Sequence, residues 1–342
     1  MSILHVQNLT LRFGGLTAVN KVNFEVERGQ IFSVIGPNGA GKTTVFNAIT
    51  GIYEPTEGAV LINGRPGMRP VTAPTIIGIL AIGLLTAIGF TIAVNAETLW
   101  DASITANYIY QQSFPWGKAA GDALAFLRAL PRNWSVLPAI GGLFVGLAGA
   151  TSVWRRARRT PDVVARQGVG RTFQNPRLFH QMTVMENVLV GMDTKLRSRF
   201  WHAASRLGFR KEHNKAVEKA MALLEFVELD DDASAAASCL SYGHQRRLEI
   251  ARALASEPAL LLLDEPAAGM NPAESVELME LIRKIRDRGV AVVLIEHHMN
   301  LVMGVSDRIA VLDYGNKIAE GTPDEIQANP EVRKAYLGTE DV

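Results

Sequence analysis

Residues 36–43 carry the sequence Gly-Pro-Asn-Gly-Ala-Gly-Lys-Thr, which matches the pattern G-x-x-x-x-G-K-[ST]. A short apolar run, 31–35, precedes the motif, and a helical pattern, 43–50, follows it. Between a strand and a helix, such glycines let backbone N–H groups surround a phosphate, and the helix N-terminus adds its positive end. This loop predicts a site for a nucleoside triphosphate. The residues expected to contact it are Gly36, Pro37, Asn38, Gly39, Ala40, Gly41, Lys42, Thr43 and Thr44.

Two further apolar runs of strand length, 259–263 and 290–295, each follow a helical stretch. Buried parallel strands that alternate with helices produce this pattern. The alternating segments 6–13 and 22–26 flank a Gly-Gly turn and predict antiparallel pairing. The expected fold class is therefore α/β, a parallel sheet with an antiparallel β lobe at its N-terminus.

Composition argues against proteins whose main partner is nucleic acid and excludes those held together by intrachain disulfides. The net charge is +1, which gives no electrostatic basis for nucleic acid as a main partner. The chain has one cysteine, Cys239, so it has no intrachain disulfide framework.

The apolar run 260–263 ends in two acids, Asp264 and Glu265. At the carboxyl end of a parallel strand, Asp264 is placed to hold Mg²⁺ through its hydration shell, and Thr43 to ligate the same ion through its hydroxyl. Glu265 is placed to polarise an attacking water. We therefore expect a nucleoside triphosphate to bind together with Mg²⁺.

A second helix start, Ser241-Tyr242-Gly243, could also bind phosphate. One chain has no evident need for two such helix ends, so this one would serve the nucleotide of another subunit. The alternative is ordinary N-capping by Ser241.

The segment 70–154 differs from the rest of the chain, because its 85 residues hold only six charged side chains. Two stretches within it, 71–96 and 133–154, have no charge at all. About 20 apolar residues suffice to cross a bilayer, so we expect transmembrane spans at about 74–96 and 134–154, joined by an external loop, 97–133. The alternative is a buried, water-soluble helical hairpin.

The second stretch is the weaker candidate for a span, since it contains Pro138 and four glycines. Gly142, Gly146 and Ala150 recur at every fourth residue, which places small side chains on one helical face. We expect this face to pack on the first helix or on a helix of another subunit.

Arginines flank the pair of apolar stretches. Arg65 and Arg69 precede it, and Arg155, Arg156, Arg158 and Arg159 follow it. The excess of Arg predicts that both ends are cytoplasmic and that the loop lies on the other side of the membrane.

The segment Leu-Ser-Tyr-Gly-His-Gln, 240–245, resembles the ABC ATPase signature, and it stands in family order between the phosphate loop and Asp264. The resemblance covers about 1–66 and 160–342 and implies a P-loop hydrolase of ABC type with a helical signature subdomain and ATP as its nucleotide. It further implies the following assignments: Ser241, Gly243 and Gln245 act on the nucleotide of a second subunit, Gln174 is the Q-loop glutamine near Mg²⁺ and water, 268–271 is the D-loop, and His297 is the switch histidine. Phe13 matches the aromatic residue that stacks on adenine, with a core strand residue as the alternative.

Further segments, including Arg-Thr-Phe-Gln-Asn and the tail Gly-Thr-Pro-Asp-Glu-Ile, look like those of branched-chain amino acid uptake ATPases, with urea and amide uptake ATPases as close relatives. The resemblance implies an ATP-hydrolysing importer subunit at the bacterial inner membrane, with its ATPase domain in the cytoplasm. Its expected partners are a second, related ATPase subunit, two permease subunits and a periplasmic substrate-binding protein. The alternatives are a lipid exporter ATPase and, from a different class, a non-transport ABC ATPase.

The expected domains are thus an ATPase part at 1–69, an inserted hydrophobic hairpin at 70–154 and the remainder of the ATPase at 155–342. Three roles for the insertion remain open: a helix pair that packs on the permease, a membrane anchor for the ATPase itself, or an insertion without a role in transport.

Overall fold

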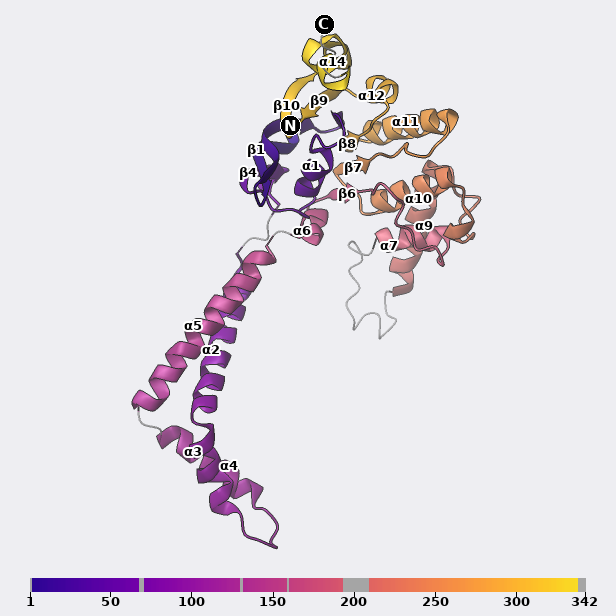
Figure 1. The fold of residues 1–342 in the computed structure, drawn as a ribbon. Coiled ribbons are helices and arrows are strands. Elements are labelled where there is room, and N and C mark those ends of the chain that lie inside the picture. The colour runs from indigo at the N-terminus through magenta and orange to yellow at the C-terminus, as the bar shows by residue number, and fades with distance from the viewer. Residues whose placement is uncertain (1, 68–70, 130–131, 159, 193–208, 338–342) are drawn as a thin grey trace. The chain divides into compact units, whose positions relative to one another are not determined.

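The computed structural model describes residues 2–67, 71–129, 132–158, 160–192 and 209–337 (Figure 1). The side chains of 132–135 and 209–211 lie outside this description. The chain divides into two compact units, one formed by Met1–Met68 with Arg159–Val342 and the other by Arg69–Arg158.

The first unit contains an antiparallel sheet with the strand order β2-β1-β4-β5. Its strands are β1 (Ser2–Phe13), β2 (Leu16–Glu27), β4 (Glu57–Ile62) and β5 (Arg65–Pro66). Gly14 and Gly15 form the turn between β1 and β2, where Phe13 pairs with Leu16.

A second sheet has the order β10-β9-β3-β8-β7-β6. Its parallel strands are β3 (Ile31–Ile35), β6 (Val169–Arg171), β7 (Leu260–Asp264), β8 (Ala291–Ile295) and β9 (Arg308–Asp313), and the edge strand β10 (Asn316–Gly321) runs antiparallel to β9. The expected parallel sheet with an antiparallel lobe is confirmed. Strands β5, β6, β9 and β10 were not predicted from the sequence.

Both faces of this second sheet are covered, which explains its continuous apolar runs. Alternate residues such as Phe32 and Leu262 join a core formed with the antiparallel sheet and helix α1 (Lys42–Ile49). The intervening residues, such as Leu261 and Leu263, join a core formed with helices. The carboxyl ends of β3 and β7, between these cores, carry the phosphate loop and the two acids.

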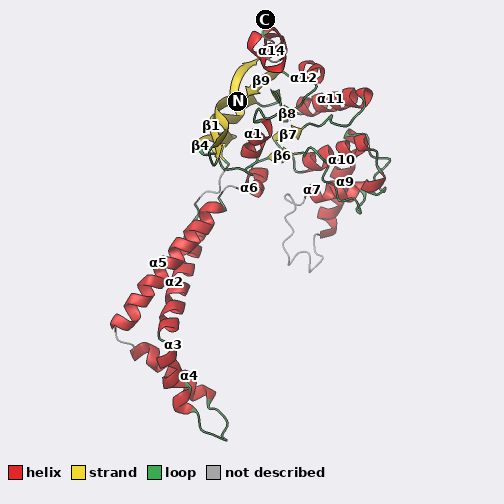
Figure 2. Ribbon diagram, in the orientation of Figure 1, coloured by secondary structure: helices red, strands yellow, loops and turns green. Residues whose placement is uncertain are grey.

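Helices α7 (Val184–Gly191), α9 (Phe209–Phe226) and α10 (Tyr242–Ala255) form one group within that helical layer (Figure 2). The remaining helices of this unit are α6 (Pro161–Arg166), α11 (Pro272–Asp287), α12 (Met299–Val305), α13 (Pro323–Ala328) and α14 (Pro330–Leu337).

The second unit is helical. Helix α2 (Ala73–Val94) packs along α5 (Arg132–Arg156), which contains Pro138 within its length. An ideal Cβ on Gly142 would lie 2.6 Å from the carbonyl oxygen of Thr86, and one on Gly146 would lie 3.0 Å from the Cα of Gly83. Small residues therefore let the two backbones approach closely, and the first apolar helix is the partner of the glycine face of the second.

The segment expected as an external loop, 97–133, is not an open loop. It contains most of α3 (Ala96–Ser103), a short 3₁₀ turn (Thr105–Asn107), α4 (Trp116–Ala129) and the start of α5. The side-chain amide of Asn107 donates to Asp122 at 2.7 Å and joins the turn to α4. Residues 130–131 of this segment, and the flanking Arg69 and Arg159, lie outside the described residues.

Candidate functional site

The phosphate loop between β3 and α1 depends on glycine at two positions. Gly36 has φ 152° and Gly41 has φ 97°. A Cβ at Gly36 would lie 2.1 Å from the carbonyl oxygen of Leu312, and one at Gly41 would lie 2.7 Å from that of Ala18. Both positions of the loop therefore require glycine, because any other residue would bring its Cβ into the neighbouring backbone.

Lys42 opens α1 and turns back into the loop. Its Nζ donates to the carbonyl oxygens of Gly36 at 2.7 Å and Pro37 at 2.9 Å, and the residue is only 6% exposed. Burial lowers the pKa of Lys42, and the charges of Glu265 and Asp264 partly oppose that shift. A buried cation above a glycine loop and a helix N-terminus fits a phosphate group.

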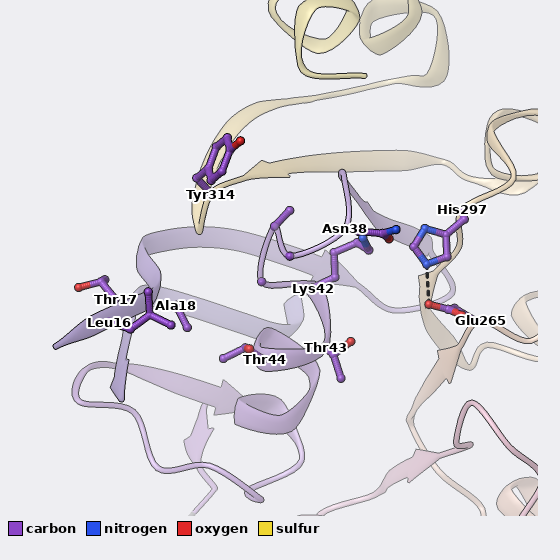
Figure 3. Close-up of a pocket in the computed structure, with 13 residues that line it drawn as sticks. Leu16, Thr17, Ala18, Asn38, Lys42, Thr43, Thr44, Glu265, His297 and Tyr314 are labelled. Atoms are coloured by element: carbon purple, nitrogen blue, oxygen red, sulfur yellow. Dashed lines mark hydrogen bonds and ion pairs between the residues drawn. The ribbon is translucent and has the colours of Figure 1, made fainter. Parts of the chain in front are cut away.

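A cavity of about 490 Å³ lies against this loop (Figure 3). Glu265 and His297 line it, together with the phosphate-loop residues 38–44. Four lining residues were not expected from the sequence, namely Leu16, Thr17, Ala18 and Tyr314. The Tyr314-Gly315 turn between β9 and β10 was a signal for the last of these.

Glu265 contacts two other residues predicted for the site, His297 and Gln174. One carboxylate oxygen lies 2.6 Å from Nε2 of His297, and the other accepts a hydrogen bond from the side-chain amide of Gln174 at 2.8 Å. Glu265 follows β7 directly and has φ 48°, a left-handed conformation that is uncommon for a residue with a side chain. The structure thus brings together all three residues expected to support hydrolysis.

Asp264 faces a different partner. Its carboxylate lies 3.0 Å from the guanidinium of Arg171, and both side chains are about nine-tenths buried. Arg171 also donates to Asn47 at 2.8 Å and Thr50 at 3.0 Å, both next to or within α1. Asp264 and the Thr43 hydroxyl supply oxygen ligands of the kind that Mg²⁺ prefers. No role for Arg171 was predicted from the sequence.

Two more buried charges support the site and also escaped the sequence analysis. Glu296 accepts from the backbone N–H groups of Ala267 at 2.8 Å and His297 at 3.1 Å. Arg246, 1% exposed, donates to the carbonyl oxygens of Phe173 and Gln174 and pairs with Glu249 at 3.1 Å. Burial raises the pKa of Glu249, and its contacts with Phe173 and Arg246 oppose the shift. The signature helix thereby fixes the backbone around Gln174.

The signature residues do not line the cavity of their own chain. Ser241 caps α10 by accepting from the backbone N–H of His244 at 3.3 Å. The Gln245 amide donates to the carbonyl oxygen of Leu240, and a Cβ on Gly243 would lie 3.1 Å from the Glu274 carboxylate. N-capping by Ser241 is therefore present, and action on a second subunit stays a prediction.

Phe13 does not line the cavity either. Its ring meets that of Tyr53 edge to face, with centroids 5.1 Å apart, and it is 44% exposed. This exposure is not that of a core strand residue. Contact with adenine stays a prediction.

Comparisons with known proteins agree with this geometry. The ABC transporter family matches residues 19–78 and 149–268, and a family described as "Branched-chain amino acid ATP-binding cassette transporter" matches 316–342. The high-affinity branched-chain amino acid transport ATP-binding protein BraF of Pseudomonas aeruginosa is 38% identical over 98% of each chain.

The chain belongs to the ABC transporter ATP-binding proteins. LivG of Escherichia coli, which bears the same description as BraF, is 37% identical over 98% of each chain. A probable branched-chain amino acid transport ATP-binding protein of Archaeoglobus fulgidus is 31% identical over the whole of this chain and 97% of its own.

Solved structures confirm the fold of this ABC ATPase. A nucleotide-free ATP-binding cassette from an ABC transporter superposes with a TM-score of 0.63 at 23% identity, over 99% of this chain and 100% of its own. The ADP conformation of an ATP-binding cassette gives a TM-score of 0.62 at 23% identity, over 99% of each chain. The expected ABC-type P-loop fold is therefore confirmed.

Proposed function

We propose that this chain is the ATP-hydrolysing subunit of an importer for branched-chain amino acids. The observation that carries the proposal is the contact of Glu265 with both Gln174 and His297 at the edge of the phosphate-loop cavity. The names of the relatives and the match of the tail 316–342 support the choice of branched-chain amino acids.

The residues in and around the cavity have tasks that follow from their chemistry. Lys42 and the backbone N–H groups of the phosphate loop bind the phosphates of ATP. Thr43, Asp264 and Gln174 would hold Mg²⁺, which neutralises phosphate charge when it is bound. Glu265 accepts the proton of the attacking water, and His297 and Gln174 hold its carboxylate in position. Ser241, Gly243 and Gln245 would reach the nucleotide of a second ATPase subunit.

The test is the substitution Glu265→Gln in the assembled transporter. We expect ATP binding to persist while turnover falls by about 10²–10⁴-fold, the usual contribution of a positioned base. Glu280→Gln, on the exposed side of α11, is the matched control and should hydrolyse ATP normally. Wild-type turnover by Glu265→Gln would contradict the proposed role.

The proposed partners are a second ATPase subunit, two permeases and a periplasmic binding protein at the bacterial inner membrane, with the ATPase in the cytoplasm. Vesicles that contain the assembled complex should take up leucine only with ATP and the binding protein. Uptake of urea or amides in place of leucine would indicate the related importer class, and outward transport of lipid would indicate an exporter.

We further propose that α2 and α5 span the membrane. The most apolar 18-residue windows of Ala73–Val94 and Val136–Arg156 have mean hydropathies of 2.4 and 1.8, and only 11% of each window is buried. Large apolar side chains such as Leu85 and Phe144 are 67% and 74% exposed, which in water would cost stability. The ABC transporter family also leaves 79–148 unmatched between its two matched segments. These observations favour lipid over a buried, water-soluble hairpin.

Cysteine labelling tests the spans. In a Cys239→Ser background, a cysteine at Tyr110 should react with a membrane-impermeant maleimide added outside intact cells. Labelling of that position only after lysis would contradict the spans. Deletion of 70–154, followed by measurement of membrane retention without the permease, separates a self-anchor from the other two roles.

A further inference from the structure

The segment between the two proposed spans is folded, and one face of its helix α4 has no partner among the described residues of its own unit. In α4, Ala119 is 3% exposed, and Asp122 accepts from Asn107, so these residues mark the side that meets the rest of the segment. Trp116 and Leu124 are 73% and 56% exposed. The segment thus holds a defined shape while it leaves large apolar side chains uncovered.

These uncovered side chains lie in one row. Trp116, Ala120 and Leu124 follow each other at four-residue spacing, which places them on one face of a helix. Arg128 continues the row one turn further on, where the helix approaches the chain's return into α5. We call Trp116, Ala120 and Leu124 the α4 stripe. The Phe114 ring packs edge to face on Trp116, with centroids 4.8 Å apart, and enlarges the apolar surface at the start of the stripe.

The connections of the segment keep it close to the bilayer surface. Helix α2 has 22 residues, about 33 Å at 1.5 Å per residue, which matches a hydrocarbon core of about 30 Å. Only Asn95 separates the end of α2 from the start of α3. At the other end, α5 begins at Arg132, three residues after α4 ends at Ala129. A segment tied at both ends to spanning helices cannot move far from the headgroups.

We propose that the α4 stripe lies in the lipid interface on the side of the membrane opposite the ATPase unit. Tryptophan is favoured at the boundary between headgroups and acyl chains, and an amphipathic helix with one apolar face lies in that plane. Arg128 at the end of the row offers a cation to lipid phosphates. This inference rests on the proposed spans of α2 and α5.

Tryptophan fluorescence in vesicles of phosphatidylethanolamine and phosphatidylglycerol tests the inference. The full chain is prepared with Trp116 as its only tryptophan, the other four being changed to Phe. We expect strong quenching by lipids brominated near the carbonyl end of the acyl chain and weaker quenching by lipids brominated near the methyl end. The quenching constant for aqueous iodide should be several-fold lower than that of a single tryptophan placed at the exposed Lys219 of α9.

A second single-tryptophan variant, Leu84→Trp in the middle of α2, separates this inference from the spans. If Leu84→Trp is quenched by lipid and Trp116 by iodide alone, the spans hold, the interfacial placement is overturned, and the stripe is open to a soluble partner. If neither residue is quenched by lipid, the spans themselves are overturned, and the interfacial placement with them.

A matched pair of substitutions tests the stripe itself. Leu124→Asp places a charge on the stripe, whereas Ala125→Asp places it on the adjacent exposed position about 100° around the helix. We expect Leu124→Asp to shift Trp116 emission to the red and to raise iodide quenching, while Ala125→Asp leaves both near the parent values. Equal shifts in the two variants would overturn the assignment of the stripe as the lipid-facing side.

Discussion

The guanidinium of Arg171 lies 3.0 Å from the carboxylate of Asp264, and neither side chain is more than 10% exposed. The pair joins the short edge strand β6 to the end of β7, and Arg171 continues to Asn47 and Thr50 at the end of α1. One arginine therefore connects three segments around the predicted magnesium position.

Arg171→Met should lower the free energy of unfolding by about 3–5 kcal/mol, because it leaves a buried carboxylate without its partner. Denaturant unfolding in detergent, followed by circular dichroism, measures the change. Arg12→Met is the control, since its pair with Glu57 is about half exposed and should contribute less than about 1 kcal/mol. Equal effects of the two substitutions would contradict the importance of the buried pair.

Lys42→Met should change how stability depends on pH in the nucleotide-free protein. Burial holds the pKa of Lys42 in the folded protein below the ordinary 10.5 of the unfolded chain. At a pH between the lowered pKa and 10.5, the unfolded chain therefore binds more protons than the folded one. The stability of the wild type relative to Lys42→Met should therefore rise as the pH increases toward 10.5.

The measurement is the difference in unfolding free energy between the two proteins across that range. The exposed substitution Lys219→Met controls for the loss of one positive charge. If the unfolding free energy of the wild type relative to Lys42→Met fell as the pH rises, the lowered pKa of Lys42 would be contradicted. ATP should stabilise the wild type and have no effect on Lys42→Met.

Tyr336→Phe should weaken ATP binding. The Tyr336 hydroxyl lies near the backbone of Gly36, where a hydrogen bond would lower the pKa of the hydroxyl and join α14 to the first glycine of the phosphate loop. Loss of one such bond costs about 1 kcal/mol, or about five-fold in the dissociation constant of ATP. Calorimetric titration measures the change, and the exposed Tyr110→Phe should have no effect.

The burial of Tyr336 has a separate pH signature, which the contact with Gly36 opposes. Burial raises the pKa of Tyr336 to about 12. Because this value lies above the ordinary 10.0, the contribution of Tyr336 to stability is complete below pH 10 and is lost as the pH rises through about 12. Tyr336→Phe should remove that loss. An unchanged alkaline profile would argue against the burial of the Tyr336 hydroxyl.

Gly142→Ala should destabilise the helix pair in detergent. The added methyl group would lie 2.6 Å from the Thr86 carbonyl oxygen and 2.9 Å from the Cα of Ala87, so the backbones must separate. Overpacking of this kind costs about 1–3 kcal/mol. Gly149→Ala is the control, because its Cβ would meet nothing within 4 Å. In thermal melting, Gly142→Ala should therefore unfold at a lower temperature than Gly149→Ala.

Local patterns were sufficient to predict the nucleotide loop and its neighbours. The strand predicted at 31–35 is β3, and the acids expected after 260–263 do end β7, because a buried strand and a glycine loop each leave a short-range signature. The helices α3 and α4 were not predicted, although the Ala- and Leu-rich sequence of α4 favours a helix, because the segment between the two apolar stretches was interpreted only as their connection.

The buried arginines that support the site, Arg171 and Arg246, could not be found in this way. Arg171 meets Asp264 across 93 residues, and Arg246 meets Gln174 across 72. Such contacts form only when β6, β7 and α10 assemble. The sequence close to each of these residues therefore contains no pattern that predicts its partner. Pairing across the sheet gives Arg171 its partner, and burial makes that partner necessary.

The order of strands in the second sheet has a consequence for biosynthesis. Strand β3, which carries the phosphate loop, pairs with β8 and β9, and both leave the ribosome after α2 and α5. The apolar hairpin is therefore synthesised before the strands that complete the sheet around the nucleotide site. On the proposed topology, both spans can enter the bilayer while that site is still unfinished.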